Sequence, residues 1–171
     1  MFAIDQSRAR GHDLREEAGI LGANQILSAT PFATKACPVV FRDSSMREIL
    51  AFEHPTEGLQ IVKGGIETGE DGRTAALREL FEEAGIANAS IARDLGTWGS
   101  PHDEHVWSLH LCAYQPDLPE TWIHHCLDDG GHNLKFFWHP VHTPAGEGWA
   151  PQFQHALAEI RERTRALRWR G

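Results

Sequence analysis

Three glutamates in the middle of the chain have the spacing expected of a metal-binding helix face. Glu79, Glu82 and Glu83 stand at positions i, i+3 and i+4, which share one side of an α-helix. Like charges at this spacing destabilise a helix by about a few tenths of a kcal/mol per pair. A bound divalent cation removes that repulsion, and Mg²⁺ and Mn²⁺ prefer carboxylate oxygens. The spacing therefore predicts a site for Mg²⁺ or Mn²⁺ on this helix.

The segment around these glutamates carries its own helix boundaries. Asp71 suits the N-cap, because an aspartate side chain can accept a free backbone N–H of the first turn. Gly85 suits the left-handed residue that ends a helix. Arg78 precedes Glu82 by four residues, which predicts an ion pair between them. Apolar residues at helical spacing predict a buried face opposite the glutamates: Ala76, Leu77, Leu80, Phe81 and Ala84.

The helix belongs to a longer pattern that begins upstream of it. Residues 64–86 have the sequence GGIETGEDGRTAALRELFEEAGI and fit Gly-x5-Glu-x7-Arg-Glu-U-x-Glu-Glu-x-Gly-U, where U is a bulky aliphatic residue. The fixed positions are Gly64, Glu70, Arg78, Glu79, Leu80, Glu82, Glu83, Gly85 and Ile86. This segment resembles the Nudix box, the signature of the Nudix hydrolases. A solvated acidic helix face, the usual explanation of a charge run, does not account for the upstream Gly64, Gly69 and Glu70.

The resemblance implies a fold and a reaction. Nudix proteins place a mixed sheet between helices, so we expect an α/β protein with a Nudix-like α/β/α sandwich. Nudix enzymes hydrolyse pyrophosphate linkages in nucleoside diphosphate derivatives with the help of a divalent metal. By position in the motif, the expected ligands of Mg²⁺ or Mn²⁺ are Glu79, Glu82 and Glu83. Arg78 would hold these carboxylates in place, and Glu70 would tie the loop to the start of the helix.

The general base and the substrate contacts lie partly outside the motif. In the family the base can be a glutamate of the box or an acid from a downstream loop. The downstream candidates are Asp103, Glu104, Asp128 and Asp129. We favour Glu104, because it directly precedes a predicted strand near the sheet edge. Lys63 and Gly64 are expected to contact substrate, since the backbone there runs close to the phosphates, and a carbonyl of either residue is a plausible further metal ligand.

Two features point to different substrates. The Lys63-Gly64 step resembles that of dinucleoside polyphosphate hydrolases and RNA 5′-pyrophosphohydrolases, and the lysine could place a point charge on a distal phosphate. Pro101 lies fifteen positions after Ile86, the spacing of a proline that marks many ADP-ribose pyrophosphatases. An ADP-ribose or sugar-nucleotide pyrophosphatase is therefore the alternative. A non-catalytic nucleotide-sensing module is a third hypothesis, but such modules usually lose box carboxylates and none is missing here.

Strand and helix patterns on both sides of the motif complete the predicted fold. Residues 1–33 are interpreted as an N-terminal extension of unknown role, and residues 34–171 as the domain. A C-terminal amphipathic helix is expected over residues 151–169. Strands are expected over residues 35–42, 48–53, 59–63, 90–98, 106–114 and 134–139. Within residues 106–114 apolar and polar positions alternate, which predicts a strand with one buried face.

The composition limits the kinds of partner that the protein is expected to bind. The 171 residues are 41% hydrophobic and 23% charged, and no apolar run approaches the length of about 20 residues that spans a bilayer. The three cysteines are odd in number and widely spaced, which is typical of a reduced, cytoplasmic protein without a secretory signal. A net charge of −8 argues against general nucleic-acid binding. We expect a small phosphorylated substrate, no membrane partner and no structural zinc; a homodimer is left open.

Overall fold

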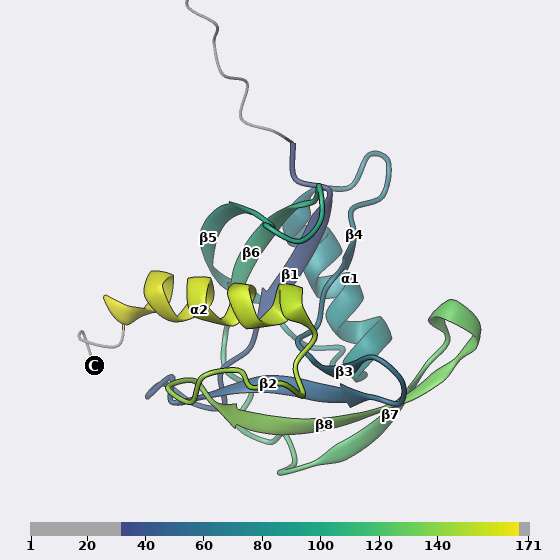
Figure 1. The fold of residues 1–171 in the computed structure, drawn as a ribbon, viewed down its shortest axis with the longest axis vertical. Coiled ribbons are helices and arrows are strands. Elements are labelled where there is room, and N and C mark those ends of the chain that lie inside the picture. Colours follow the sequence, from purple (N-terminus) through teal and green to yellow (C-terminus); the bar gives the residue numbers. More distant parts are fainter. Residues whose placement is uncertain (1–31, 168–171) are drawn as a thin grey trace, which may run out of the picture. The chain divides into compact units, whose positions relative to one another are not determined.

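The strands form two four-stranded sheets in the computed structural model, which describes residues 32–167 except the side chain of Asp129 (Figure 1). The first sheet has the order β4 (Gly64–Gly65), β1 (Lys35–Val39), β6 (Val106–Cys112) and β5 (Ile91–Gly99). The second has the order β3 (Gly58–Gln60), β2 (Glu48–His54), β8 (His132–Pro140) and β7 (Trp122–Cys126). A short 3-10 helix, η1 (Asp128–Gly130), connects β7 to β8.

Strand directions differ between the two sheets. In the first sheet β1 pairs in parallel with β6 and antiparallel with β4, so this sheet is mixed. In the second sheet β3, β2, β8 and β7 pair antiparallel throughout. A mixed α/β fold, as expected from the sequence, is therefore confirmed.

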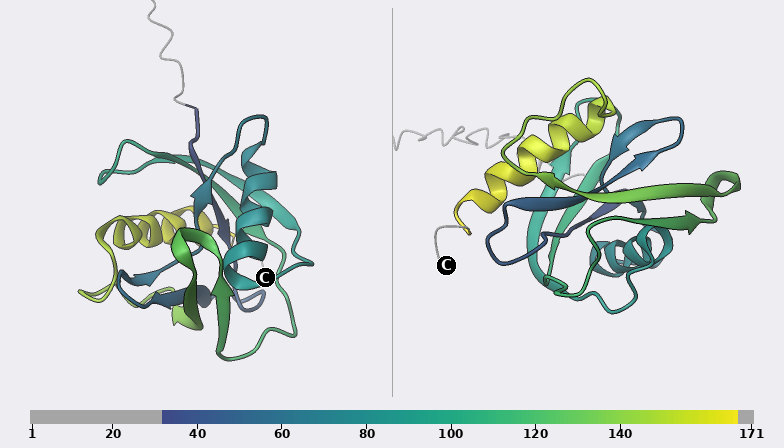
Figure 2. Two further views of the ribbon diagram at one scale, coloured as in Figure 1. Left: turned by 90° about the vertical axis from the view of Figure 1, so that its right-hand side faces the viewer. Right: turned by 90° about the horizontal axis from the view of Figure 1, so that it is seen from below.

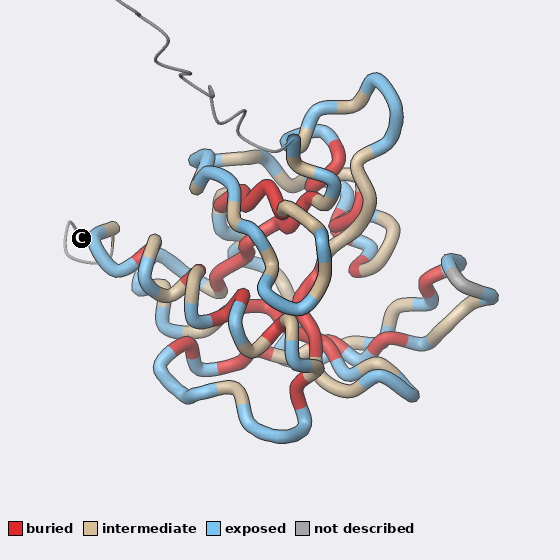
Figure 3. Tube along the Cα trace, turned by 45° about the horizontal axis from the view of Figure 1, so that its top comes forward, coloured by how far each residue is buried: buried red, intermediate tan, exposed pale blue. Residues whose placement is uncertain are grey.

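Two helices enclose the strands from opposite sides. α1 (Gly72–Ala84) packs mainly against β1 and also against β7 and β6. On the other side lies α2 (Pro151–Arg165), whose Phe153 ring meets the Trp107 ring of β6 with centroids 5.6 Å apart. The right-hand view of Figure 2 shows strands between the two helices, and Figure 3 shows buried stretches gathered toward the middle of the described part. These are the layers of the predicted α/β/α sandwich.

Several predicted elements have different limits, and two strands, β4 and β7, are new. The predicted strand over residues 59–63 shortens to β3, and the predicted C-terminal helix ends at Arg165; residues 168–171 lie outside the described part. Neither β4 nor β7 is predicted from the sequence. Residues 1–31 also lie outside the described part, so the boundary between an extension and the domain stays a prediction.

The predicted orientation of two elements is partly wrong. β6 does not have one exposed face, because α1 covers the face that carries Ser108, His110 and Cys112, and all three are buried. On α1 itself, Phe81 is 55% exposed whereas Glu79 is only 5% exposed. Glu79 therefore faces the protein, and Phe81 of the predicted apolar face points to solvent.

Candidate active site

Local capping fixes both ends of α1. The Asp71 carboxylate accepts a hydrogen bond from the backbone N–H of Thr74 at 2.7 Å, and Asp71 is the N-cap. Hydrogen bonds from Thr74 lower the pKa of the Asp71 carboxyl, so the cap is charged at neutral pH. Gly85 ends the helix with φ of 74°, a left-handed conformation that suits glycine. Both predicted caps are confirmed, and they fix the helical frame on which the glutamates stand.

The loop before α1 passes directly over a glutamate. If Gly64 carried a Cβ, that atom would lie 1.7 Å from the carboxyl carbon of Glu79 and 1.9 Å from both carboxylate oxygens. Real Cβ atoms essentially never come within 3.0 Å of such neighbours. A side chain at position 64 would therefore displace either the loop or the Glu79 carboxylate.

Arg78 connects this loop to the acidic face of the helix. One guanidinium nitrogen donates to both Glu79 and Glu82, each at 2.8 Å. Two further nitrogens donate to Glu70 at 3.0 and 2.9 Å, and one of them also donates to the carbonyl oxygen of Gly65 at 2.7 Å. The predicted Arg78–Glu82 ion pair is present. The guanidinium also lowers the pKa of the Glu70 carboxyl, mainly by hydrogen bonding.

A third acid joins two of the glutamates. Glu79, Glu82 and Asp128 each offer a carboxylate oxygen, and these oxygens all lie within 4.8 Å of one another. Within the described residues this is the one group of three or more acidic, histidine or cysteine side chains with ligand atoms so close. Asp128 comes from η1, far from α1 in the sequence. Three converging carboxylates make a donor set that suits a hard divalent cation.

Glu83 is a buried acid for which the protein provides little compensation. Its Oε2 atom is buried and has no hydrogen-bond partner among the described residues. Burial raises the pKa of Glu83 to about 8, and the neighbouring charge of Glu79 adds to the shift. Burial likewise raises the pKa of Glu79, although the hydrogen bond from Arg78 opposes this. A buried carboxylate with an unsatisfied oxygen beside two other acids is the arrangement that a cation would stabilise.

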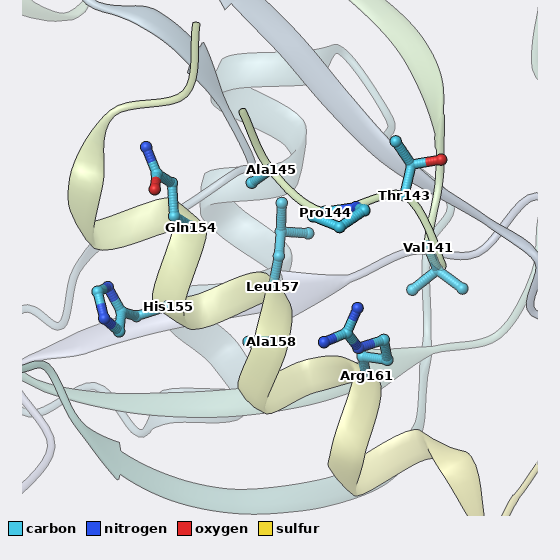
Figure 4. A pocket seen from close by; sticks show the side chains of 9 residues that line it. All are labelled: Val141, Thr143, Pro144, Ala145, Gln154, His155, Leu157, Ala158 and Arg161. Atoms are coloured by element: carbon cyan, nitrogen blue, oxygen red, sulfur yellow. The ribbon is translucent and has the colours of Figure 1, made fainter. Parts of the chain in front are cut away.

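Glu79, Glu83 and Asp128 line a cleft beside α1 to which both sheets contribute. The cleft has a volume of about 360 Å³, within the usual range for small-molecule sites. Its lining residues are Lys35, Phe52, His54, Glu57, Gln60, Lys63, Gly64, Gly65, Glu79, Glu83, Cys126, Asp128, His132 and Leu134. A hollow of about 270 Å³ between α2 and the segment after β8 has no carboxylate in its lining (Figure 4). The first cleft is therefore the better candidate for metal-assisted chemistry.

Lys63 lies in the cleft but is turned toward aromatic rings. Its Nζ atom is 5.3 Å from the centroid of the Trp107 ring and 5.7 Å from that of Phe153. Burial lowers the pKa of the Lys63 ammonium, and the charge of Lys35 lowers it further. The Lys63 backbone hydrogen-bonds to Glu83 and opposes the upward pKa shift of that residue. A contact between the Lys63 side chain and a distal phosphate stays a prediction.

The structure separates the candidates for general base. Glu104 is exposed in the segment between β5 and β6 and does not line the cleft. Asp103, its neighbour, does not line it either. Asp128 does, beside Glu79 and Glu83. The sequence offers Asp128 only as one acid of a DDGG turn, and nothing local distinguishes it from Glu104.

β7 brings Asp128 to the helix and also holds the end of that helix. The Trp122 indole N–H donates to the carbonyl oxygen of Ala84 at 3.0 Å. The Nε2 atom of His124 lies 3.1 Å from the carbonyl oxygen of Glu82. The last carbonyl groups of a helix have no partner within it, so these side chains satisfy groups that would otherwise be unbonded. Sequence analysis does not find this role for either residue.

Comparisons with known proteins agree with the geometry. The family model described as NUDIX domain matches residues 33–160. RNA pyrophosphohydrolase from Dinoroseobacter shibae is 44% identical over 63 residues, which are 36% of this chain and 39% of that protein. RNA pyrophosphohydrolase from Brucella abortus (strain 2308) is 44% identical over 93 residues, 47% of this chain and 52% of that protein. The chain thus spans about half or less of these curated relatives.

Solved structures resemble the fold at low sequence identity. A NUDIX hydrolase from Nitrosomonas europaea has a TM-score of 0.55 and 16% identity, covering 80% of this chain and 74% of that one. A UDP-X diphosphatase has a TM-score of 0.54 and 13% identity, covering 85% and 66%. At this identity the likeness concerns the fold alone. In the described part of the chain no helix is long and apolar enough to cross a membrane.

Proposed function

The chain belongs to the Nudix family, and we propose that it hydrolyses a pyrophosphate bond in a nucleoside diphosphate derivative with Mg²⁺ or Mn²⁺. The observation that carries this proposal is the acidic cluster of Glu79, Glu82 and Asp128 beside the unsatisfied oxygen of Glu83. None of the box carboxylates is missing, which favours an enzyme over a nucleotide-sensing module.

The four acidic residues of the candidate site have separate proposed roles. Glu79, Glu82 and Glu83 are the proposed metal ligands. A bound divalent ion neutralises phosphate charge and lowers the pKa of a coordinated water. A carboxylate oxygen of Asp128 lies within 4.8 Å of those of Glu79 and Glu82. We therefore propose Asp128, in preference to Glu104, as the general base that accepts a proton from the attacking water. Arg78 keeps Glu79 and Glu82 in place through its two 2.8 Å hydrogen bonds.

The proposed substrates carry more than two phosphates. Lys35 and Lys63 both line the cleft, and Lys35 pairs with Gly65 across β1 and β4. These cations provide local attraction for phosphates in a chain whose net charge is −8. The curated relatives are named RNA pyrophosphohydrolases. A dinucleoside polyphosphate or a 5′-triphosphate end is therefore the preferred substrate, and ADP-ribose is the alternative that rests on Pro101.

Activity screening tests the reaction. Purified protein would be incubated with diadenosine tetraphosphate, 5′-triphosphorylated RNA or ADP-ribose, each with Mg²⁺ or Mn²⁺, and nucleotide and phosphate release would be measured. We expect turnover that Glu82→Gln lowers by about two orders of magnitude or more without loss of folding. Glu147→Gln, at an exposed position outside the cleft, is the matched control. No metal-dependent release from any substrate would refute the proposal.

Metal binding can be tested separately from turnover. Titration with Mn²⁺ should reveal a site that Glu83→Gln weakens strongly, because the substitution removes an anionic ligand. Equal Mn²⁺ affinity of the wild type and Glu83→Gln would place the metal elsewhere.

The phosphate preference has its own variant. Lys63→Ala should lower kcat/KM about tenfold or more for diadenosine tetraphosphate, as expected for loss of one charge-assisted contact, and less for ADP-ribose. Equal losses on both substrates would remove the reason to prefer the polyphosphate.

A further inference from the structure

A tight turn orients the His54 ring at the end of β2. The backbone N–H groups of Thr56 and Glu57 lie 3.3 and 3.2 Å from the Nδ1 atom of His54. The Thr56 hydroxyl is also 3.3 Å from this atom. Backbone N–H groups can only donate, so Nδ1 must be the unprotonated acceptor. The turn contacts therefore assign the acceptor role to Nδ1 and the ring N–H to Nε2.

The free edge of this imidazole belongs to the cleft of the proposed active site. His54 and His132 both line that cleft, and their ring centroids are 4.6 Å apart. His132 begins β8, directly after the turn that carries Asp128. The contact with His132 restricts the His54 ring, while the turn restrains Nδ1. In this arrangement Nε2–H is the hydrogen-bond donor that the His54 ring can offer to a ligand of the cleft.

Hydrogen-bond acceptors line the same cleft as this donor. Gln60 donates from its amide nitrogen to Glu57 at 3.0 Å, so the amide oxygen of Gln60 and the second carboxylate oxygen of Glu57 are acceptors. Glu57 and Gln60 both line the cleft. An uncharged donor beside acceptors, one of them anionic, suits a group that both donates and accepts hydrogen bonds. A phosphate would be repelled by Glu57, and a hydroxyl would not.

We propose that His54, with Glu57 and Gln60, binds a ribose hydroxyl of the substrate and makes the enzyme select ribonucleotides over deoxyribonucleotides. This inference rests on the proposed function. Lys35 and Lys63 lie beside the glycine loop, where phosphates are expected, whereas His54 lies at the β2–β3 turn. The cleft accordingly divides its contacts between a phosphate region and a sugar region.

The experiment compares substrates that differ only in the sugar. Diadenosine tetraphosphate and its 2′-deoxy and 3′-deoxy counterparts would be assayed with the wild type, and KM and kcat determined. We expect kcat/KM to fall about tenfold for at least one deoxy substrate, as for the loss of one neutral hydrogen bond. His54→Asn separates the two roles of the histidine. Its side-chain oxygen can accept the turn N–H groups near the position of Nδ1, but nothing replaces Nε2–H.

His54→Asn should therefore keep the melting temperature of the wild type and lose the preference for the ribose substrate. His54→Gln, which places an amide N–H near the position of Nε2, should recover part of that preference. Equal turnover of all three substrates by the wild type would overturn the inference and leave the proposed function intact. A preference that persists in His54→Asn would also overturn it. Absence of turnover of all three substrates by the wild type would instead count against the proposed function, and the inference would fall with it.

Discussion

Replacement of Gly64 by alanine is the most direct test of how the glycine loop and Glu79 depend on each other. The added Cβ would lie 1.7 Å from the Glu79 carboxyl carbon, about 1.3 Å short of the 3.0 Å below which Cβ contacts essentially do not occur. Either the loop or the carboxylate must move by at least that amount. Misplacement of a catalytic group by about 1 Å can lower a rate by about a hundredfold. We therefore expect Gly64→Ala to lower kcat/KM by about a hundredfold or more.

The neighbouring glycine provides a matched control. A Cβ on Gly65 would meet nothing within 4 Å, although Gly65 belongs to the same strand and the same loop. Gly65→Ala should therefore keep most of the activity and the Mn²⁺ affinity. Steady-state kinetics, Mn²⁺ titration and thermal unfolding of both variants would separate a local effect from misfolding. Similar kinetics for the two variants would refute the steric argument, and so would unfolding of Gly64→Ala.

Three further substitutions test how α1 is held. Leu80→Ala should lower the free energy of unfolding by about 2–5 kcal/mol in urea denaturation, because Leu80 is fully buried; a smaller loss would mean that the site collapses around the smaller side chain. Asp71→Ala should lower the melting temperature by less than Leu80→Ala, since it removes one capping hydrogen bond; an unchanged temperature would argue against the cap. His124→Leu should weaken Mn²⁺ binding by about tenfold, because His124 contacts the carbonyl oxygen of Glu82 near the end of α1 and residues that orient metal ligands have effects of this size. His124→Gln should restore the affinity. Equal Mn²⁺ affinity in all three forms would limit the role of His124 to packing.

The sequence predicts the parts of the site whose geometry is local. The caps at Asp71 and Gly85 and the Arg78–Glu82 ion pair depend on residues within one or two helical turns. Their spacing along the chain therefore determines their spacing in space. The requirement for Gly64 is also visible in the motif, but its cause is not. That cause is the Glu79 carboxylate, fifteen positions later in the sequence.

The position of Asp128 could not be predicted, because it depends on contacts distant in the sequence. β7 alternates between partly buried and exposed residues and contains two adjacent histidines, so its pattern is weak for a strand. Its pairing with β8 and the hydrogen bonds of Trp122 and His124 to the end of α1 hold it in place. Only these contacts distinguish Asp128 from Glu104. Asp128 and Glu104 are thus alike in local sequence, but only Asp128 lines the cleft with Glu79 and Glu83.

The exposure of Phe81 and the burial of Glu79 on α1 differ from the prediction and indicate what the helix does. A helix that served only to fill a core would bury Phe81 and expose Glu79, yet Glu79 is 5% exposed and Phe81 is 55% exposed. Burial of a carboxylate is unfavourable unless hydrogen bonds or a cation compensate. Arg78 compensates Glu79 in part, and no group in the described part of the chain satisfies the buried Oε2 atom of Glu83. Such departures from the rule of burying apolar residues are expected at functional sites. The orientation of α1 therefore supports a cation-binding role independently of the motif.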